Sequence, residues 1–168
     1  MYIHTMNDFT ILKSTHELDD ESKALIDRAT LALQDAYAPY SNFHVATAVL
    51  LQDGTVVTGT NQENAAYPSG MCAERVALFS VASQHPGKKI KKLLVIAKSA
   101  GQSDLTPATS CGPCRQVMLE FEQRQAEPFE VIMQTSGRHW VKARSASSLL
   151  PYSFSNESLQ VRNKDLKR

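Results

Sequence analysis

The sequence has no marked excess of charge of either sign and no long apolar run. Lys and Arg together number 18 and Asp and Glu 17, which gives a formal net charge of +1. Proteins that grip a nucleic-acid backbone usually carry a basic excess, so this balance favours a small or neutral partner. No apolar run approaches the roughly 18–20 residues of a membrane span. Residues 1–13 also lack the basic start and apolar stretch of a secretory signal. We therefore expect a cytoplasmic protein with no membrane or nucleic-acid partner.

Cysteine is scarce, and its number is odd. The only three are Cys72, Cys111 and Cys114, which cannot all pair within one chain. In a reducing compartment structural disulfides are rare, and a Cys-x-x-Cys pair there indicates metal or redox chemistry. The cysteines therefore point to a reactive or metal-binding site.

Length and composition indicate one ordinary globular domain. A chain of 168 residues with 42% hydrophobic and 21% charged residues can bury a stable core without disulfide or metal cross-links. We expect an N-terminal extension over residues 1–18, one main domain over 19–160 and a C-terminal tail over 161–168.

Hydrophobic spacing and turn signals predict an α/β fold. Leu25, Ala29 and Ala32 fall on one helical face, Asp53-Gly54 indicates a hairpin, and Pro113 suits the first turn of a helix. The predicted elements are a helix over 20–38, strands 43–51 and 55–60, a helix over 72–84, a strand over 92–98, a helix from 113 to about 125, and strands 129–134 and 139–143. This order predicts a mixed sheet of about five strands with helices on its faces.

All three cysteines lie at predicted helix starts. Free N–H groups and a partial positive charge at a helix N-terminus favour thiolates. Structural zinc normally has four protein ligands, whereas catalytic zinc has three and keeps one position open for water. Cys72, Cys111 and Cys114 therefore predict an open, catalytic zinc site.

Glu74, two residues after Cys72, is the predicted proton carrier. At a helix cap Cys72 can leave the helical track, so that both side chains reach one cavity. A carboxylate beside the water of a zinc site suits a general base, and its protonated form suits a general acid. Arg75 and Gln116 are predicted to donate hydrogen bonds to the sulfurs, which would offset the net negative charge of a three-thiolate site.

Other interpretations of these residues remain open at this point. The Cys-x-x-Cys could be a redox pair, and Cys72 could be a small core residue. A structural zinc could also be completed by His44, His85 or His139.

The motif CAER at 72–75, followed by CGPCRQ at 111–116, resembles the homotetrameric cytidine deaminases. Zinc deaminases carry a first ligand, a glutamate two residues on and a later Cys-x-x-Cys. The stretches APYSNFHV at 38–45, NQENAAY at 61–67 and LLPYSF at 149–154 resemble the same three-cysteine family. The resemblance spans roughly residues 25–160.

The resemblance implies a three-layer α/β/α fold, one Zn²⁺ per subunit and hydrolytic deamination of cytidine and 2′-deoxycytidine. It also implies that Asn61 and Glu63 bind the ribose 3′-hydroxyl and that Tyr67 lies near the 5′-hydroxyl. Phe43 and the Ala73 backbone would hold the base. Phe154 would enter a neighbouring subunit's site in a homotetramer. Without the family, the two phenylalanines could equally be core, and Asn61 and Glu63 could be solvated turn residues.

Two positions depart from the family pattern. Ser110 stands where the family usually has proline, in the loop whose carbonyls, at Thr109 and Ser110, would face the substrate amine. Ala46-Thr47 replaces a Gly-Ala pair, which changes packing near the site or at a subunit contact. The metal ligands and Glu74 follow the pattern.

Three rival functions remain open. One is a deaminase of another aminopyrimidine nucleoside, such as a blasticidin-type antibiotic. Another, a polynucleotide deaminase, is disfavoured because basic and aromatic residues are not interleaved. The third is a non-catalytic structural-zinc module, in which Glu74 would have no purpose.

Overall fold

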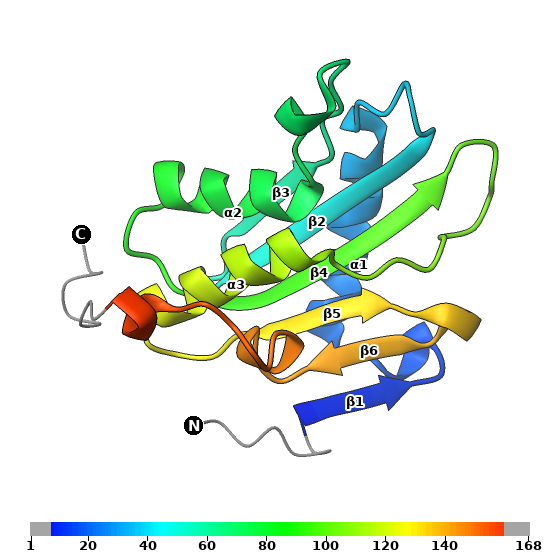
Figure 1. Cartoon of the computed structure of the whole chain (residues 1–168). Helices are drawn as coiled ribbons and strands as arrows, with labels where there is room; N and C mark the ends of the chain where they lie inside the picture. The colour runs from blue at the N-terminus through cyan, green and yellow to red at the C-terminus, as the bar shows by residue number, and fades with distance from the viewer. Residues whose placement is uncertain (1–7, 160–168) are drawn as a thin grey trace.

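The structure, a computed structural model, describes residues 8–159 and is a three-layer α/β/α sandwich (Figure 1). The expected tail over 161–168 lies outside the described residues. Three α-helices are described: α1 (Asp20–Ala32), α2 (Ala73–Gln84) and α3 (Gly112–Gln125). The strands are β1 (Phe9–Leu12), β2 (Phe43–Leu51), β3 (Val56–Thr60), β4 (Ile90–Ser99), β5 (Glu130–Gln134) and β6 (Trp140–Ala143).

The six strands form one mixed sheet in the order β1-β6-β5-β4-β2-β3. Only β4 and β5 run parallel, and every other neighbouring pair is antiparallel. Helix α1 covers one face, while α2 and α3 lie side by side on the other (Figure 1). The expected α/β class is confirmed, with one strand more than anticipated. In the described part of the chain, no helix is long and apolar enough to cross a membrane.

The additional strand is β1, which comes from the segment expected to be an extension. It pairs antiparallel with β6, from Phe9 opposite Ala143 to Leu12 opposite Trp140. Phe9 and Ile11 remain exposed, so β1 has little of the buried apolar pattern that identifies a strand in a sequence. Its existence depends on a partner about 130 residues later in the chain.

Helix α1 is shorter than predicted. It ends at Ala32 and is followed by a 3₁₀ turn over Leu33–Asp35. The next residues become extended because Tyr37 exchanges backbone hydrogen bonds with Asn61 and Glu63. Pro39 adds to this, since a residue before proline avoids helical dihedrals. The chain thereby passes directly beside the segment that follows β3.

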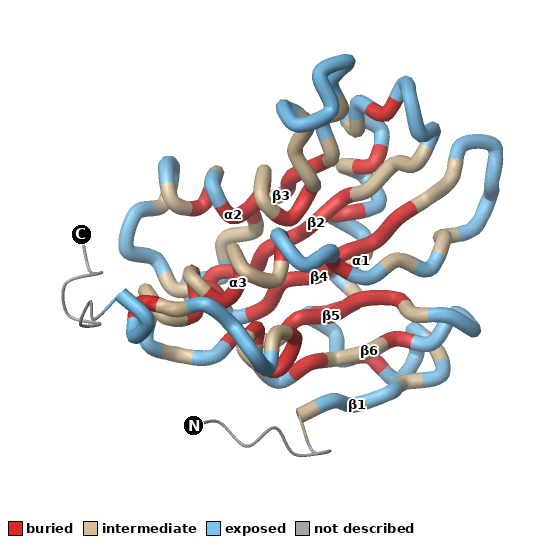
Figure 2. Tube along the Cα trace, viewed as in Figure 1, coloured by how far each residue is buried: buried red, intermediate tan, exposed pale blue. Residues whose placement is uncertain are grey.

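The central strands of the sheet consist mostly of buried residues (Figure 2), and their side chains form a core on each side of the sheet. On β2, Ala46, Ala48 and Leu50 pack toward α1, whereas Val49 and Leu51 pack toward α2 and α3. Gly59 brings α2 unusually close to β3, because a Cβ there would lie 2.4 Å from the Ala77 nitrogen. The position of α2, and of every residue at its start, therefore depends on this contact.

A buried lysine joins α1 to the sheet. Lys92 on β4 is only 6% exposed. Its Nζ lies 2.7 Å from the Asp19 carboxylate, 3.1 Å from Glu21 and 3.4 Å from Glu130. Asp19 is also the N-cap of α1, where it accepts a hydrogen bond from the Ser22 N–H. The positive charge of Lys92 thus offsets acidic groups at the start of α1 and on the neighbouring strand β5.

Candidate metal centre and adjoining cavity

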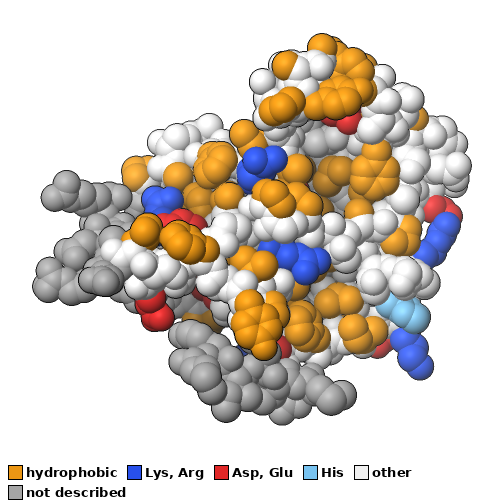
Figure 3. Space-filling view, viewed as in Figure 1, with side chains coloured by type: hydrophobic (Ala, Val, Ile, Leu, Met, Phe, Trp, Pro, Cys, Tyr) orange, Lys and Arg blue, Asp and Glu red, His pale blue; other side chains and the backbone are white. Residues whose placement is uncertain are grey.

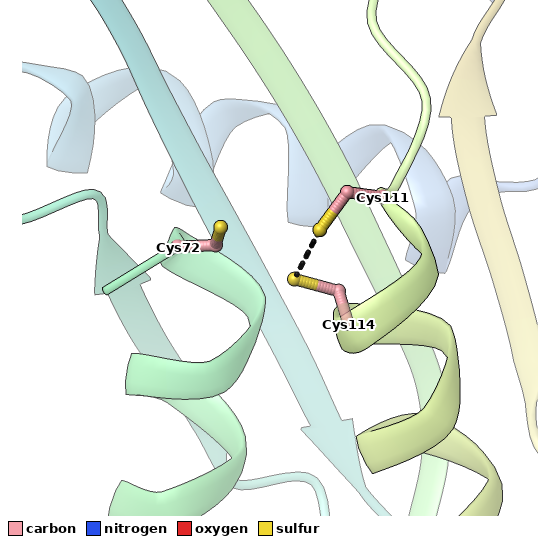
Figure 4. Close-up of side chains that lie close together, drawn as sticks. All are labelled: Cys72, Cys111 and Cys114. Atoms are coloured by element: carbon pink, nitrogen blue, oxygen red, sulfur yellow. Dashed lines mark hydrogen bonds between the residues drawn. The ribbon is translucent and has the colours of Figure 1, made fainter. Parts of the chain in front are cut away.

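The three cysteine sulfurs converge between the starts of α2 and α3 (Figure 4). All three lie within 4.8 Å of one another, and the Cys111 and Cys114 sulfurs are 3.4 Å apart. Cys72 and Cys111 are the N-cap residues of their helices and have extended backbones. Because the backbones of these two cap residues are extended, their side chains do not follow the spiral of the helix. Cys114 reaches the same point from the first turn of α3. Within residues 8–159 this group contains the three cysteines and no histidine.

The thiols share negative charge unequally. Hydrogen bonding from Cys114, assisted by Arg75, lowers the pKa of Cys72 to about 5 although burial opposes it. The pKa of Cys114 is raised, because its thiol hydrogen-bonds to Cys72 and is buried. A proton is thus held among closely spaced sulfurs at two helix N-termini. Zn²⁺ binds thiolates strongly and would take the place of that proton, so the donor set fits one zinc ion.

Arg75 is the positive group beside this cluster. Its Nη2 lies 3.6 Å from the Cys72 sulfur, and this contact raises the pKa of Arg75. Gln116, the other expected donor, gives its side-chain N–H to the Phe154 carbonyl at 2.8 Å. Of the two residues, Arg75 therefore contacts a sulfur, whereas Gln116 binds the segment that follows β6.

Glu74 is a buried carboxyl in the first turn of α2. It is 4% exposed, and burial raises its pKa, while the negative charge of Cys72 acts in the same direction. A carboxyl whose pKa is moved toward neutrality can both accept and release a proton near physiological pH. Its environment therefore suits acid–base work.

A cavity of about 530 Å³ opens beside Cys72 and Arg75. Its other lining residues come from the loops around residues 40 and 61–71: Tyr40, Ser41, Asn61, Gln62, Glu63, Asn64, Tyr67, Gly70 and Met71. Three of the expected substrate residues, Asn61, Glu63 and Tyr67, are among them. The tyrosine and serine at 40 and 41 were not singled out, although they stand inside the APYSNF stretch that resembles the family.

The side chains of Asn61 and Glu63 are tied to backbone. Asn61 accepts from the Val45 N–H at 2.8 Å and donates to the Phe43 carbonyl at 2.9 Å. Glu63 accepts from the N–H groups of Tyr40 and Ser41 and, at 2.5 Å, from the Ser41 hydroxyl. These bonds lower the pKa of Glu63, the Ser41 hydroxyl most strongly. Each side chain retains capacity for a further partner, and each is held in one orientation.

Two aromatic rings line the cavity, and two more expected substrate-binding aromatics lie elsewhere in the chain. Tyr67 is 76% exposed and meets Tyr40 edge to face, with ring centroids 6.0 Å apart. Phe154 is 62% exposed, and Phe43 is half-buried at the start of β2. Hydrophobic side chains are visible over much of this face, including the projecting segment between β3 and α2 (Figure 3).

Known proteins with similar sequences and structures identify the family of this chain. The family model for the cytidine and deoxycytidylate deaminase zinc-binding region matches residues 19–127. A cytidine deaminase of Sporosarcina psychrophila is 37% identical over 135 residues, which cover 80% of this chain and 92% of that one. A probable cytidine deaminase of Dictyostelium discoideum is 37% identical over 140 residues, 83% of this chain and 88% of the relative.

Among solved structures, the crystal structure of cytidine deaminase from Burkholderia pseudomallei matches with a TM-score of 0.65 and 38% identity. The match covers 82% of this chain and all of that one. Together with the three clustered thiols and the sandwich fold, these similarities show that the chain belongs to the cytidine and deoxycytidylate deaminase zinc-binding family.

Proposed function

We propose that this protein is a zinc-dependent hydrolase that deaminates cytidine and 2′-deoxycytidine, giving uridine or 2′-deoxyuridine and ammonia for pyrimidine salvage. The observation that carries this proposal is the group of three thiols next to an open cavity, with the buried Glu74 in the first turn of the helix that Cys72 caps. The relatives named as cytidine deaminases support it.

Cys72, Cys111 and Cys114 would hold the zinc ion, whose chemistry is to lower the pKa of a water molecule and orient it for attack. Arg75, at 3.6 Å from the Cys72 sulfur, would offset the excess negative charge of three thiolates. Gln116 on α3 would contribute either by holding the 149–154 segment in place or by donating a hydrogen bond to a sulfur.

Glu74 would carry the protons of the reaction. As a carboxylate it takes a proton from the attacking water and delivers it to N3 of the pyrimidine, which makes C4 electrophilic. The water oxygen then bonds to C4. Glu74, again a carboxylate, next takes the remaining proton from the oxygen on C4 and passes it to the amino group, so that the C4–N bond breaks, ammonia leaves and the C4 carbonyl forms. One group thus acts as base and then as acid, which suits its raised pKa.

The cavity would receive the sugar and the base. Asn61 and Glu63 would bind the 3′-hydroxyl and Tyr67 would lie near the 5′-hydroxyl; all three line the cavity. Phe43 and the Ala73 backbone would contact the base. Neither residue is among those that line the cavity; the Phe43 carbonyl accepts from Asn61, which does line it, and Ala73 follows Cys72.

The working form would be a homotetramer with sites completed across subunits. Phe154 and Tyr67 are more than half exposed, as expected of side chains that are covered by a neighbouring copy. The cytosol is the expected compartment, because free thiols persist there. Analytical ultracentrifugation of the full chain tests the assembly, and a monomer that turns over cytidine at full rate would contradict it.

The deciding assay measures loss of absorbance on cytidine, 2′-deoxycytidine, cytosine and a blasticidin-type nucleoside, with and without a chelator. We expect turnover of both pyrimidine nucleosides, little turnover of free cytosine, and loss of activity on zinc removal. Preference for the blasticidin-type compound would assign the site to another aminopyrimidine. Stoichiometric zinc with four protein ligands and no turnover would instead indicate a structural module.

A further inference from the structure

The carboxylate of Glu63 is held at the cavity by three donors from the turn that precedes β2. The N–H groups of Tyr40 and Ser41 lie 2.9 Å and 3.2 Å from its Oε2, and the Ser41 hydroxyl lies 2.5 Å from its Oε1. All three residues line the cavity beside Cys72. The backbone therefore holds one oxygen of the carboxylate, and a single side chain, that of Ser41, holds the other.

The Ser41 hydroxyl is itself oriented by the start of β2. Its Oγ accepts a hydrogen bond from the Phe43 N–H at 3.1 Å. A hydroxyl has one proton and two lone pairs, so with a lone pair facing Phe43 its proton can point at the carboxylate. The main chain of Glu63 is fixed as well, because its N–H donates to the Tyr37 carbonyl at 2.8 Å. Both ends of the contact between Ser41 and Glu63 are thus set by the backbone.

These donors decide where the carboxylate of Glu63 can accept from a ligand. A carboxylate offers about four lone-pair positions, and the two N–H groups and the Ser41 hydroxyl occupy one side of each oxygen or more. The position left over lies on Oε1, the oxygen that Ser41 holds. The last torsion of a glutamate side chain is soft, so without Ser41 a ligand would have to restrict the swing of Oε1 when it binds, which weakens affinity.

We propose that Ser41 is a positioning residue for substrate binding, which orients Glu63 so that Oε1 accepts a hydrogen bond from the 3′-hydroxyl of the nucleoside. The inference rests on the proposed function, in which Glu63 binds that hydroxyl. Ser41 thereby controls the affinity for substrates that carry a 3′-hydroxyl, while Glu63 remains the group that contacts the sugar. An interaction made equally in the bound substrate and the transition state changes KM and leaves kcat unchanged.

Two isomeric substrates test this directly, because they differ only in which sugar hydroxyl is missing. 2′-Deoxycytidine carries the 3′-hydroxyl, whereas 3′-deoxycytidine does not. For zinc-loaded Ser41→Ala we expect KM for 2′-deoxycytidine to rise about five-fold at unchanged kcat, as for loss of one ordinary hydrogen bond. The kcat/KM for 3′-deoxycytidine should stay within about two-fold of the wild type. A misfolded fraction would lower the turnover of both isomers equally.

Matched variants separate the hydroxyl of Ser41 from the shape of its side chain. Ser41→Thr keeps the hydroxyl, and Ser41→Val has nearly the same shape without it, so KM for 2′-deoxycytidine should be about five-fold lower in the Thr variant. Ser69→Ala is the control, since that exposed serine follows Tyr67 in the neighbouring loop but does not line the cavity. It should change neither KM.

A double-mutant cycle shows whether Ser41 acts through Glu63. In a Glu63→Ala background the carboxylate is gone, so adding Ser41→Ala should produce no further rise in KM for 2′-deoxycytidine. Non-additivity of this kind is expected of two residues that contribute to one interaction.

The inference is overturned if Ser41→Ala keeps the wild-type KM, if its loss lies in kcat, if both isomers are affected alike, if the Thr and Val variants agree, or if the two alanine variants are additive. A wild type with equal kcat/KM for both isomers would overturn it together with the assignment of Glu63 to the 3′-hydroxyl. Deamination by the wild type stands in all these cases. A zinc-loaded wild type that leaves cytidine and both isomers unchanged would instead overturn the proposed function.

Discussion

The two faces of the sheet hold different kinds of buried ionisable group. On the α1 face the buried Lys92 is surrounded by the carboxylates of Asp19, Glu21 and Glu130. On the α2 and α3 face lie three thiols, the buried Glu74 and the unpartnered hydroxyl of Ser110. The buried cation of the first face is paired with carboxylates, whereas the second face gathers thiols and the buried Glu74 carboxyl at two helix starts.

The Thr47 hydroxyl extends this contrast along the sheet. Thr47 is fully buried, and its Oγ1 has no partner among the described residues. Strand alternation puts it on the same side of β2 as Val45 and Val49, which pack toward α2 and α3. Thr47 and Ser110, the two departures from the family pattern that carry a hydroxyl, thus both lie on the side of the sheet that α2 and α3 cover. Local rules are commonly broken where a protein does its chemistry, and this face is where we place it.

The largest effect should follow from Cys114→Ala. Cys114 is the fully buried member of the sulfur group, so its loss removes one of three proposed ligands from the closed side of the site. We expect zinc measured by atomic absorption to fall to background and turnover to disappear with it. The matched control is Val117→Ala on the same helix, which should retain the metal. Tight, stoichiometric zinc in Cys114→Ala would contradict its role as a ligand.

Glu74→Gln should separate the metal from the chemistry. The amide has the same shape but cannot accept and release the proton, so kcat should fall by about 10³-fold or more while zinc is retained. The control is Glu120→Gln, a half-buried glutamate of α3, which should turn over cytidine normally. Activity within about ten-fold of the wild type in Glu74→Gln would remove this carboxyl from the mechanism.

Gly59→Ala should disturb the catalytic face through packing alone. The new Cβ would lie 2.4 Å from the Ala77 nitrogen and 2.7 Å from the Ala73 carbonyl, so α2 would have to move. We expect the free energy of unfolding in urea to fall by about 3 kcal/mol, together with weaker zinc binding. Gly112→Ala meets nothing within 4 Å and should change the stability little. Equal stabilities for the two variants would show that the sheet and helix can separate freely here.

The smallest effect is expected on the α1 face, from Asp19→Asn. Burial would raise the pKa of Asp19, but hydrogen bonds from Lys92 and Ser22 outweigh it and hold the pKa well below its usual range. Because the folded-state pKa is the lower one, this stabilisation is present above the unfolded value near pH 4 and is lost as pH falls toward the folded value. Asparagine caps helices as well as aspartate does, so the change isolates the charge.

The carboxyl of Asp19 is about two-fifths exposed, and solvent screening should limit the loss to about 1 kcal/mol at pH 7. The difference from the wild type should shrink in urea titrations below about pH 4, and cytidine turnover should not change. Asp20→Asn is the control, since that carboxyl is fully exposed. A pH-independent difference would show that the Lys92 pair contributes nothing through its charge.

The sequence predicted those parts of the molecule that local pattern controls. Cys72 and Cys111 stand at helix caps as expected, and β2 has the predicted bounds, because capping and apolar alternation are local properties. The early end of α1 was missed, since Tyr37 leaves the helix to pair with Asn61 and Glu63. Non-local pairing of this kind leaves no periodic signal.

The cavity shows the same limit. Asn61 and Glu63 were chosen by resemblance, but their anchoring to Phe43, Val45 and Ser41 became visible only in the fold. The contacts of the buried Ser110 were equally hidden, because its backbone N–H and carbonyl bond to Met133 and Arg115 only once the chain is folded. A sequence can show which side chains are present, but it does not show which hydrogen bonds remain unused.

The pairing of β1 with β6 has a consequence for synthesis of the chain. Phe9 leaves the ribosome early, whereas its partner Ala143 follows 134 positions later, on the order of ten seconds at ordinary translation rates. During that time the first strand has no sheet to join, and when β6 does form, its outer edge is open until β1 arrives. The first of the described strands to be made is therefore among the last to be placed, and truncation before residue 140 would leave it without β6 as its partner.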